Sequence, residues 1–123
     1  MIYDIAIIGA GVTGAMTAHY LARYNVSVAV LEAGSDVASG TTKANSAIVH
    51  AGFDAKPGTK KAALNVKGCA MMEALTDKLG VHYKKCGSYV LGFSENDRER
   101  LEELKARGEQ NGVPELSDRK SVV

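Results

Sequence analysis

The chain has 123 residues, of which 46% are hydrophobic and 24% charged, as is ordinary for one small globular domain. No apolar run reaches the ~18–20 residues of a membrane-spanning helix, and the opening residues lack the basic start of a signal peptide. We therefore predict a cytoplasmic protein without a transmembrane segment. The net charge is only +1 and there is no arginine-rich arm, so we expect no nucleic-acid partner.

The cysteines and the charge distribution add two weaker indications. Cys69 and Cys86 form no CxxC pair, and no His, Asp or Glu cluster has metal-ligand spacing, so we predict reduced thiols and no metal. Residues 41–85 hold eight Lys against three acids, a charge of +5. This excess could attract an anionic ligand, although solvated lysines on a helix face are the more ordinary explanation.

The first 34 residues read as one β-α-β unit. The apolar run at residues 2–8 predicts a strand buried on both faces. A glycine-rich turn follows at 9–14, helical spacing of apolar residues predicts a helix at 15–24, and residues 26–31 form a second strand that ends at Glu32. Such a unit implies parallel strands with a right-handed crossover.

The rest of the chain is predicted to be a loop, two helices and short strands. The polar loop at 33–47 leads to an extended piece around 48–49. A helix at 60–79 should present Leu64, Met71, Leu75 and Leu79 on one face and end at Gly80. One or two short strands are predicted at 83–93. Ser94, with Asp97 three residues later, should begin a charged helix that runs to about Gln110 and is stopped by Gly112 and Pro114, before a frayed end at 117–123. The predicted organisation is 1–34 for the β-α-β unit, 35–55 for a cofactor-binding loop, 56–93 for the helix and short strands, and 94–123 for the charged helix and frayed end.

The turn carries a GxGxxG motif, which alone is a weak signal of dinucleotide binding. Here Gly9 permits a tight turn, Gly11 lets the backbone approach a pyrophosphate, and Gly14 permits close helix packing. The helix N-terminus offers N–H groups to phosphates, and Glu32 can accept hydrogen bonds from ribose hydroxyls. The fingerprint suits NAD(P) as well as FAD, and a glycine turn that binds nothing is the structural alternative.

Two longer stretches of the sequence distinguish between FAD and NAD(P). Residues 2–34 (IYDIAIIGAGVTGAMTAHYLARYNVSVAVLEAG) and 39–68 (SGTTKANSAIVHAGFDAKPGTKKAALNVKG) resemble the D-amino-acid-oxidase-like superfamily of FAD-dependent oxidoreductases. They look most like its glycerol-3-phosphate dehydrogenase and L-2-hydroxyglutarate oxidase branch. The resemblance implies an α/β, Rossmann-like FAD-binding fold of the glutathione-reductase type, present in part. Members of the superfamily are several hundred residues long, so we expect this chain to correspond to their N-terminal portion.

The resemblance also implies roles for individual residues. Glu32, with Ala33 beside it, matches the acid that binds the adenosine ribose. The residues that match the pyrophosphate turn are Gly9, Ala10, Gly11, Val12, Thr13 and Gly14. The residues that match the segment around the pyrophosphate and ribityl chain are Gly40, Thr41, Thr42, Lys43, Ala44, Asn45 and Ser46.

His50 matches a histidine near the flavin in this branch. It could accept a proton, hydrogen-bond the flavin or attach it covalently, and a merely structural histidine is an equal alternative. The resemblance implies oxidation of a small anionic alcohol, with a quinone, another protein or oxygen as electron acceptor. Two other hypotheses stay open from the residues alone: a nucleotide-binding module without catalysis, and an NAD-dependent enzyme.

Overall fold

A computed structural model describes residues 1–118. The chain divides into two compact units, residues 1–48 and 49–123, and each is described by itself. Most of the frayed end predicted for 117–123 lies outside the described residues.

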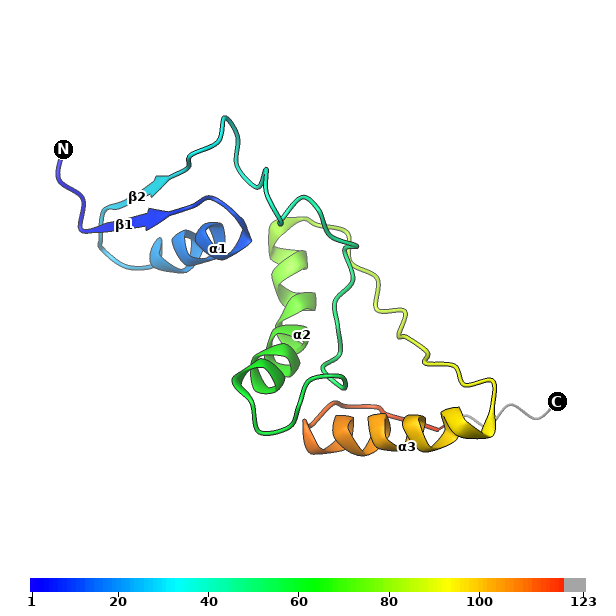
Figure 1. Cartoon of the computed structure of the whole chain (residues 1–123). Helices are drawn as coiled ribbons and strands as arrows, with labels where there is room; N and C mark the ends of the chain where they lie inside the picture. Colours follow the sequence, from blue (N-terminus) through cyan, green and yellow to red (C-terminus); the bar gives the residue numbers. More distant parts are fainter. Residues whose placement is uncertain (119–123) are drawn as a thin grey trace. The chain divides into compact units, whose positions relative to one another are not determined.

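The first unit is a β-α-β motif (Figure 1). Strand β1 (Ile5–Ile8) leads to helix α1 (Val12–Leu21), which returns the chain to strand β2 (Val28–Leu31). The two strands are parallel, in a register that runs from the pair Ile5 and Val28 to the pair Ile8 and Leu31. Helix α1 packs against both strands. The predicted parallel pair with a helical crossover is therefore confirmed.

The elements differ from the prediction in extent and burial. Both strands begin later than expected, and α1 begins at Val12, inside the glycine motif, because Gly11 is its N-cap residue. The prediction that the first strand is buried on both faces is wrong, since Ile5 and Ile7 are half-buried whereas Ile8 is 89% exposed. In the described residues the sheet has only two strands, so α1 covers one face and leaves the other to solvent.

A polar contact joins the chain just before the two strands. The carboxylate of Asp4 accepts hydrogen bonds from the hydroxyl of Ser27 at 2.6 Å and from its backbone N–H at 2.7 Å. The Asp4 N–H in turn donates to the Ser27 hydroxyl oxygen at 3.0 Å. Hydrogen bonds to the ionised form, first from the Ser27 hydroxyl and then from its N–H, hold the pKa of Asp4 below its ordinary value. This contact helps to set the strand register.

The second unit contains helix α2 (Lys60–Leu79), with the bounds that the sequence predicts. The Thr59 hydroxyl accepts a hydrogen bond from the Ala62 N–H at 3.2 Å and caps its start, as a threonine N-cap does. Gly80 ends it in the left-handed conformation, with φ of 65°, which glycine adopts at little cost.

The predicted apolar face of α2 is wrong. Leu64, Met71 and Leu79 are all exposed, and of the four predicted residues only Leu75 is half-buried. The buried and half-buried positions lie on another side of the helix, at Ala62, Asn65, Val66, Cys69, Met72 and Thr76. The prediction from helical spacing selected the larger apolar side chains. The chain at Gly52 instead lies against Asn65 and Val66 of α2.

Two further predicted extended pieces are not strands. Residues 81–93 run without secondary structure, and so do residues 46–50 around Ile48 and Val49. A strand needs a neighbour that pairs with its backbone groups. Within residues 1–118, β1 and β2 are the only strands that pair, which explains why the β-branched and aromatic residues of 83–93 form none.

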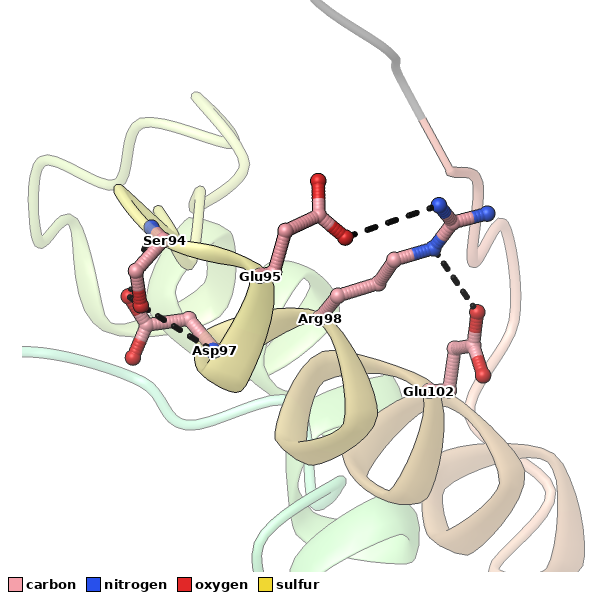
Figure 2. A network of polar contacts seen from close by, with 5 residues as sticks. All are labelled: Ser94, Glu95, Asp97, Arg98 and Glu102. Carbon is pink, nitrogen blue, oxygen red and sulfur yellow. Dashed lines mark hydrogen bonds and ion pairs between the residues drawn. The ribbon is translucent and has the colours of Figure 1, made fainter.

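Helix α3 (Glu95–Gln110) begins with the capping box that the sequence predicts (Figure 2). The Ser94 hydroxyl oxygen accepts from the Asp97 N–H at 3.3 Å, and the Asp97 carboxylate accepts from the Ser94 N–H at 3.0 Å. Hydrogen bonds from the Phe93 N–H and from Ser94 keep the pKa of Asp97 below its ordinary value. One turn later, Arg98 lies 3.4 Å from Glu102 and 3.9 Å from Glu95; all three side chains are exposed, so these ion pairs contribute little.

Candidate functional site

The glycine turn between β1 and α1 needs two of its glycines for steric reasons. Gly9 has a φ of +97°, which side chains rarely allow, and its N–H donates to the Leu31 carbonyl oxygen at 2.7 Å. A Cβ on Gly14 would lie 1.9 Å from the Gly9 carbonyl oxygen. The first turn of α1 therefore packs against the backbone of the loop, as the glycine spacing predicts.

The start of α1 faces the loop that follows β2. The N-cap residue Gly11 has no side chain to cap the helix, and the Val12 N–H instead donates to the hydroxyl oxygen of Thr42 at 2.9 Å. A Cβ on Gly11 would lie 3.2 Å from that same oxygen. The structure therefore brings Thr42 to the glycine turn, 30 residues away in sequence.

The Glu32 carboxylate lies against the same turn. One oxygen accepts from the Ala10 N–H at 2.8 Å and the other from the Gly34 N–H at 2.8 Å. These two bonds, the one from Ala10 being the larger cause, hold the pKa of Glu32 below its ordinary value. Ala10 is buried, whereas Glu32 is exposed. The structure thus joins the acid at the end of β2 to the glycine turn and leaves its carboxylate accessible to solvent.

The loop of residues 38–47 is held by hydrogen bonds within itself and by one to the glycine turn. The Ala38 N–H donates to the Ala10 carbonyl oxygen at 3.0 Å, and the Lys43 N–H to that of Gly40 at 3.0 Å. The Asn45 side chain donates to the Thr42 carbonyl oxygen and accepts from the Ala47 N–H. The amide of Asn45 thus holds the loop, whereas Thr41, Lys43, Ala44 and Ser46 are exposed.

His50 belongs to the second unit and is exposed. Its backbone carbonyl oxygen accepts a hydrogen bond from the side-chain amide of Asn65 at 2.8 Å. The residues after it are held by Arg107 and Asn111. Sequence reasoning missed these three side chains, because nothing in the spacing of residues 15 to 59 positions apart marks them as partners.

The residues of the first unit fit a dinucleotide. Gly11 has no Cβ, so a diphosphate would approach the backbone at the start of α1 beside the Thr42 hydroxyl, which lies 3.2 Å from where a Cβ of Gly11 would be. The exposed Glu32 carboxylate keeps lone pairs that could accept from ribose hydroxyls, since each of its oxygens takes one hydrogen bond from the protein. The adjacent loop adds the hydroxyl groups of Thr42 and Ser46 and the ammonium group of Lys43.

Other site types find no support in the part of the chain that the structure describes. Within residues 1–118, no three His, Cys, Asp or Glu side chains gather where they could hold a metal ion. None of the helices there has the length and apolar character needed to cross a membrane.

Comparison with known proteins gives the same cofactor. A family model described as "FAD dependent oxidoreductase" matches residues 4–122. The chain is 52% identical over 114 residues to a glycerol 3-phosphate dehydrogenase of Caloramator mitchellensis, covering 93% of this chain and 24% of that protein. It is 36% identical over 116 residues to the mitochondrial L-2-hydroxyglutarate dehydrogenase of Homo sapiens, covering 93% of this chain and 25% of that protein.

A solved structure agrees with these relatives. The dithionite-reduced L-alpha-glycerophosphate oxidase of Mycoplasma pneumoniae with FAD bound superposes with a TM-score of 0.79 at 31% identity, covering 92% of this chain and 30% of that chain. The chain thus spans about a quarter of the length of its relatives. The comparisons confirm the Rossmann-like FAD-binding fold, the choice of FAD over NAD and the resemblance to this enzyme branch. The chain belongs to the FAD-dependent oxidoreductase family.

Proposed function

We propose that this chain is the FAD-binding N-terminal portion of an enzyme that oxidises a small anionic alcohol, such as glycerol 3-phosphate or a 2-hydroxy acid. The observation that carries the FAD-binding role is the contact of Glu32 with the glycine turn, through the Ala10 N–H at 2.8 Å. It puts an acceptor for ribose beside the glycine turn, where Gly11 carries no side chain. The substrate class follows from what the relatives are named for.

Each group of residues has a proposed role. The N-terminal end of α1, where the Val12 N–H already donates to Thr42, would bind the diphosphate, and the Glu32 carboxylate would accept hydrogen bonds from the ribose. Thr42, Lys43 and Ser46 would bind the diphosphate and ribityl chain. Lys43 adds a compact positive charge suited to an anion.

In the proposed reaction, the cofactor takes part in the redox step and the chain supplies the base. When bound, FAD would supply the redox chemistry, as the acceptor of a hydride equivalent from the carbinol C–H of the substrate. A base must take the hydroxyl proton as the ketone forms, and we propose His50, because an imidazole is the side chain that most often serves as a general base. The electron acceptor stays open between a quinone, a protein and oxygen. The cytoplasmic location also stays a prediction, since some relatives are named as mitochondrial.

A nucleotide-binding module without catalysis is the second candidate. The observation that favours it is that the contacts of the glycine turn with Glu32 and Thr42 suit cofactor binding and by themselves supply no catalytic group. Turnover of glycerol 3-phosphate or L-2-hydroxyglutarate, followed as bleaching of bound flavin under anaerobic conditions, separates the two candidates. Bleaching supports the enzyme, and bound flavin that neither substrate reduces supports the module.

FAD titration tests the cofactor. We expect the chain to quench flavin fluorescence and Gly11→Val to abolish this binding, because the side chain would fill the approach of the diphosphate. Gly68→Ala is the matched control, since a Cβ there meets open space within α2 and binding should be unchanged. Unaltered FAD affinity in Gly11→Val would contradict the proposed pose, and a chain that binds NADH in place of FAD would overturn the cofactor.

A further inference from the structure

We propose that α2 and α3 clamp the segment of residues 50–55, and that Asn65 and Asn111 are positioning residues for His50. The clamp is defined as the side chains of Asn65, Arg107 and Asn111. Its importance for catalysis rests on the proposed function, because His50 matters only if it faces the flavin. All of these residues belong to the second unit.

Asn111, which directly follows α3, makes the most telling contact. Its side-chain Nδ2 donates to the Gly52 carbonyl oxygen at 2.9 Å and to the Ala55 carbonyl oxygen at 2.7 Å. Both N–H groups of the amide are therefore used. Because both partners are acceptors, only this orientation of the amide suits the site. Gly52 and Ala55 are buried, so losing the Asn111 amide would remove a hydrogen bond from the carbonyl oxygen of each.

The last turns of α3 add two more contacts on the same segment. The Arg107 guanidinium donates to the Asp54 carbonyl oxygen at 3.2 Å and lies 3.8 Å from its carboxylate. Gly108 is buried, and a Cβ there would lie 3.0 Å from the Cβ of Phe53. Although the sequence of α3 is strongly charged, its backbone at Gly108 therefore packs closely against residues 50–55.

Helix α2 holds the start of the segment. The Asn65 Nδ2 donates to the His50 carbonyl oxygen at 2.8 Å. Gly52 has a φ of +109°, and a Cβ there would lie 2.7 Å from the Val66 side chain. The main chain of the segment is therefore fixed from α2 near His50 and from α3 near its end.

The consequence concerns the imidazole of His50. Its main chain is anchored by Asn65 while its side chain is exposed. A reacting group needs this combination, since its backbone must be held within a fraction of an ångström while its ring meets the ligand. The clamp supplies the anchoring through hydrogen bonds to the main-chain carbonyl oxygens of the segment.

Proteolysis tests the clamp independently of FAD. Chymotrypsin cleaves after Phe53, within the clamped segment, and we expect Asn111→Ala and Asn65→Ala to speed this cleavage roughly tenfold through the lost hydrogen bonds. Gln110→Ala is the matched control, because Gln110 is exposed and adjacent to Asn111. Asn111→Gln, which keeps both donors, should restore part of the protection. Far-UV circular dichroism identifies any variant that has lost its helices. Equal cleavage of the folded Asn111→Ala, Asn65→Ala and Gln110→Ala chains would overturn the clamp.

A second measurement tests the positioning of His50. Added FAD should shift the His50 ring proton resonances in the unaltered chain, and this shift should shrink in the Asn65→Ala and Asn111→Ala chains while their FAD affinity stays the same. FAD that binds without moving the His50 resonances would overturn the positioning role and leave FAD binding intact. If the unaltered chain bound no FAD, the proposed function would fail, while the cleavage rates would still decide the clamp.

Discussion

At the scale of single residues, Glu32 carries two tasks on one carboxylate. Its bonds to the Ala10 and Gly34 N–H groups tie the glycine turn to the end of β2. The same bonds keep it ionised, because each stabilises the charged form. Under the proposed function, a carboxylate aligned in this way would already be oriented for ribose hydroxyls before the ligand arrives, which would lower the entropic cost of binding.

The first prediction concerns this carboxylate. Glu32→Gln keeps the shape but replaces one acceptor oxygen with a donor, which would face either the Ala10 or the Gly34 N–H. We expect FAD affinity to fall roughly tenfold, as measured by flavin fluorescence titration. Glu109→Gln, an equal change of charge at an exposed position of α3, is the control. An unchanged dissociation constant for Glu32→Gln would remove the carboxylate from the site.

The second prediction concerns pH. The pKa of Asp4 is lowered in the folded chain, chiefly by the Ser27 hydroxyl, so folding favours its ionised form. The stabilisation is therefore complete above the unfolded pKa of roughly 4 and is lost as the pH falls through the lower, folded value. We expect urea stability to decline below about pH 4. Asp4→Asn should flatten that decline, and a variant with the same acid profile as the unaltered chain would show that this pair does not contribute.

At the scale of elements, the packing of α1 on its loop depends on a missing side chain. A Cβ on Gly14 would overlap the Gly9 carbonyl oxygen at 1.9 Å, and a backbone atom cannot rotate away as a side chain can. The helix must therefore move before any larger residue fits.

The third prediction follows from that overlap. Gly14→Ala should destabilise the β-α-β unit by about 1–3 kcal/mol, the usual cost of overpacking, as measured by urea unfolding. Gly40→Ala is the matched variant in the same unit, because a Cβ there meets nothing within 4 Å, and its stability should change little. Equal stability of the two variants would contradict the close approach.

The fourth prediction concerns the start of α3. The Ser94 hydroxyl oxygen accepts a hydrogen bond from the Asp97 N–H. This N–H group has no acceptor within the helix itself. Ser94→Ala should cost about 1 kcal/mol and reduce the helical circular dichroism signal. Ser88→Ala, at an exposed serine outside the helices, should leave the signal as it is. A full helical signal and unchanged stability in Ser94→Ala would mean that Asp97 alone suffices to start the helix.

At the scale of the whole molecule, little apolar surface is buried. The buried hydrophobic side chains of the described residues are small ones, at Ala10, Ala55, Ala62 and Val113. Larger ones such as Ile8 and Phe93 are each 89% exposed. Small buried side chains remove little area from water, so hydrophobic stabilisation in the chain by itself is modest.

The fifth prediction follows from this exposed surface together with the charge. The sequence pI is about 7.8, and low net charge removes the repulsion that keeps apolar patches apart. We expect light scattering by the purified chain to rise as the pH approaches 7.8 and to fall on either side. Scattering that is flat across this range would show that the exposed side chains do not associate.

What the sequence determined by itself is local. The glycine turn, the β-α-β order, the bounds of α2 and the capping box of α3 all depend on residues within a few positions of one another. Backbone conformation and capping act over that distance, so spacing was enough to predict them. The FAD choice rested on a longer resemblance, which the comparisons confirm.

Contacts between residues that lie far apart in the sequence depend on the tertiary structure. The strands predicted at 83–93 have no partner in the described residues, and the face of α2 that packs carries Ala62 and Val66 in place of Leu64. The bond from the Val12 N–H to the Thr42 hydroxyl oxygen and the two bonds of Asn111 span 30 and more positions. Burial and side-chain hydrogen bonds depend on the whole path of the chain, and no local spacing encodes that path.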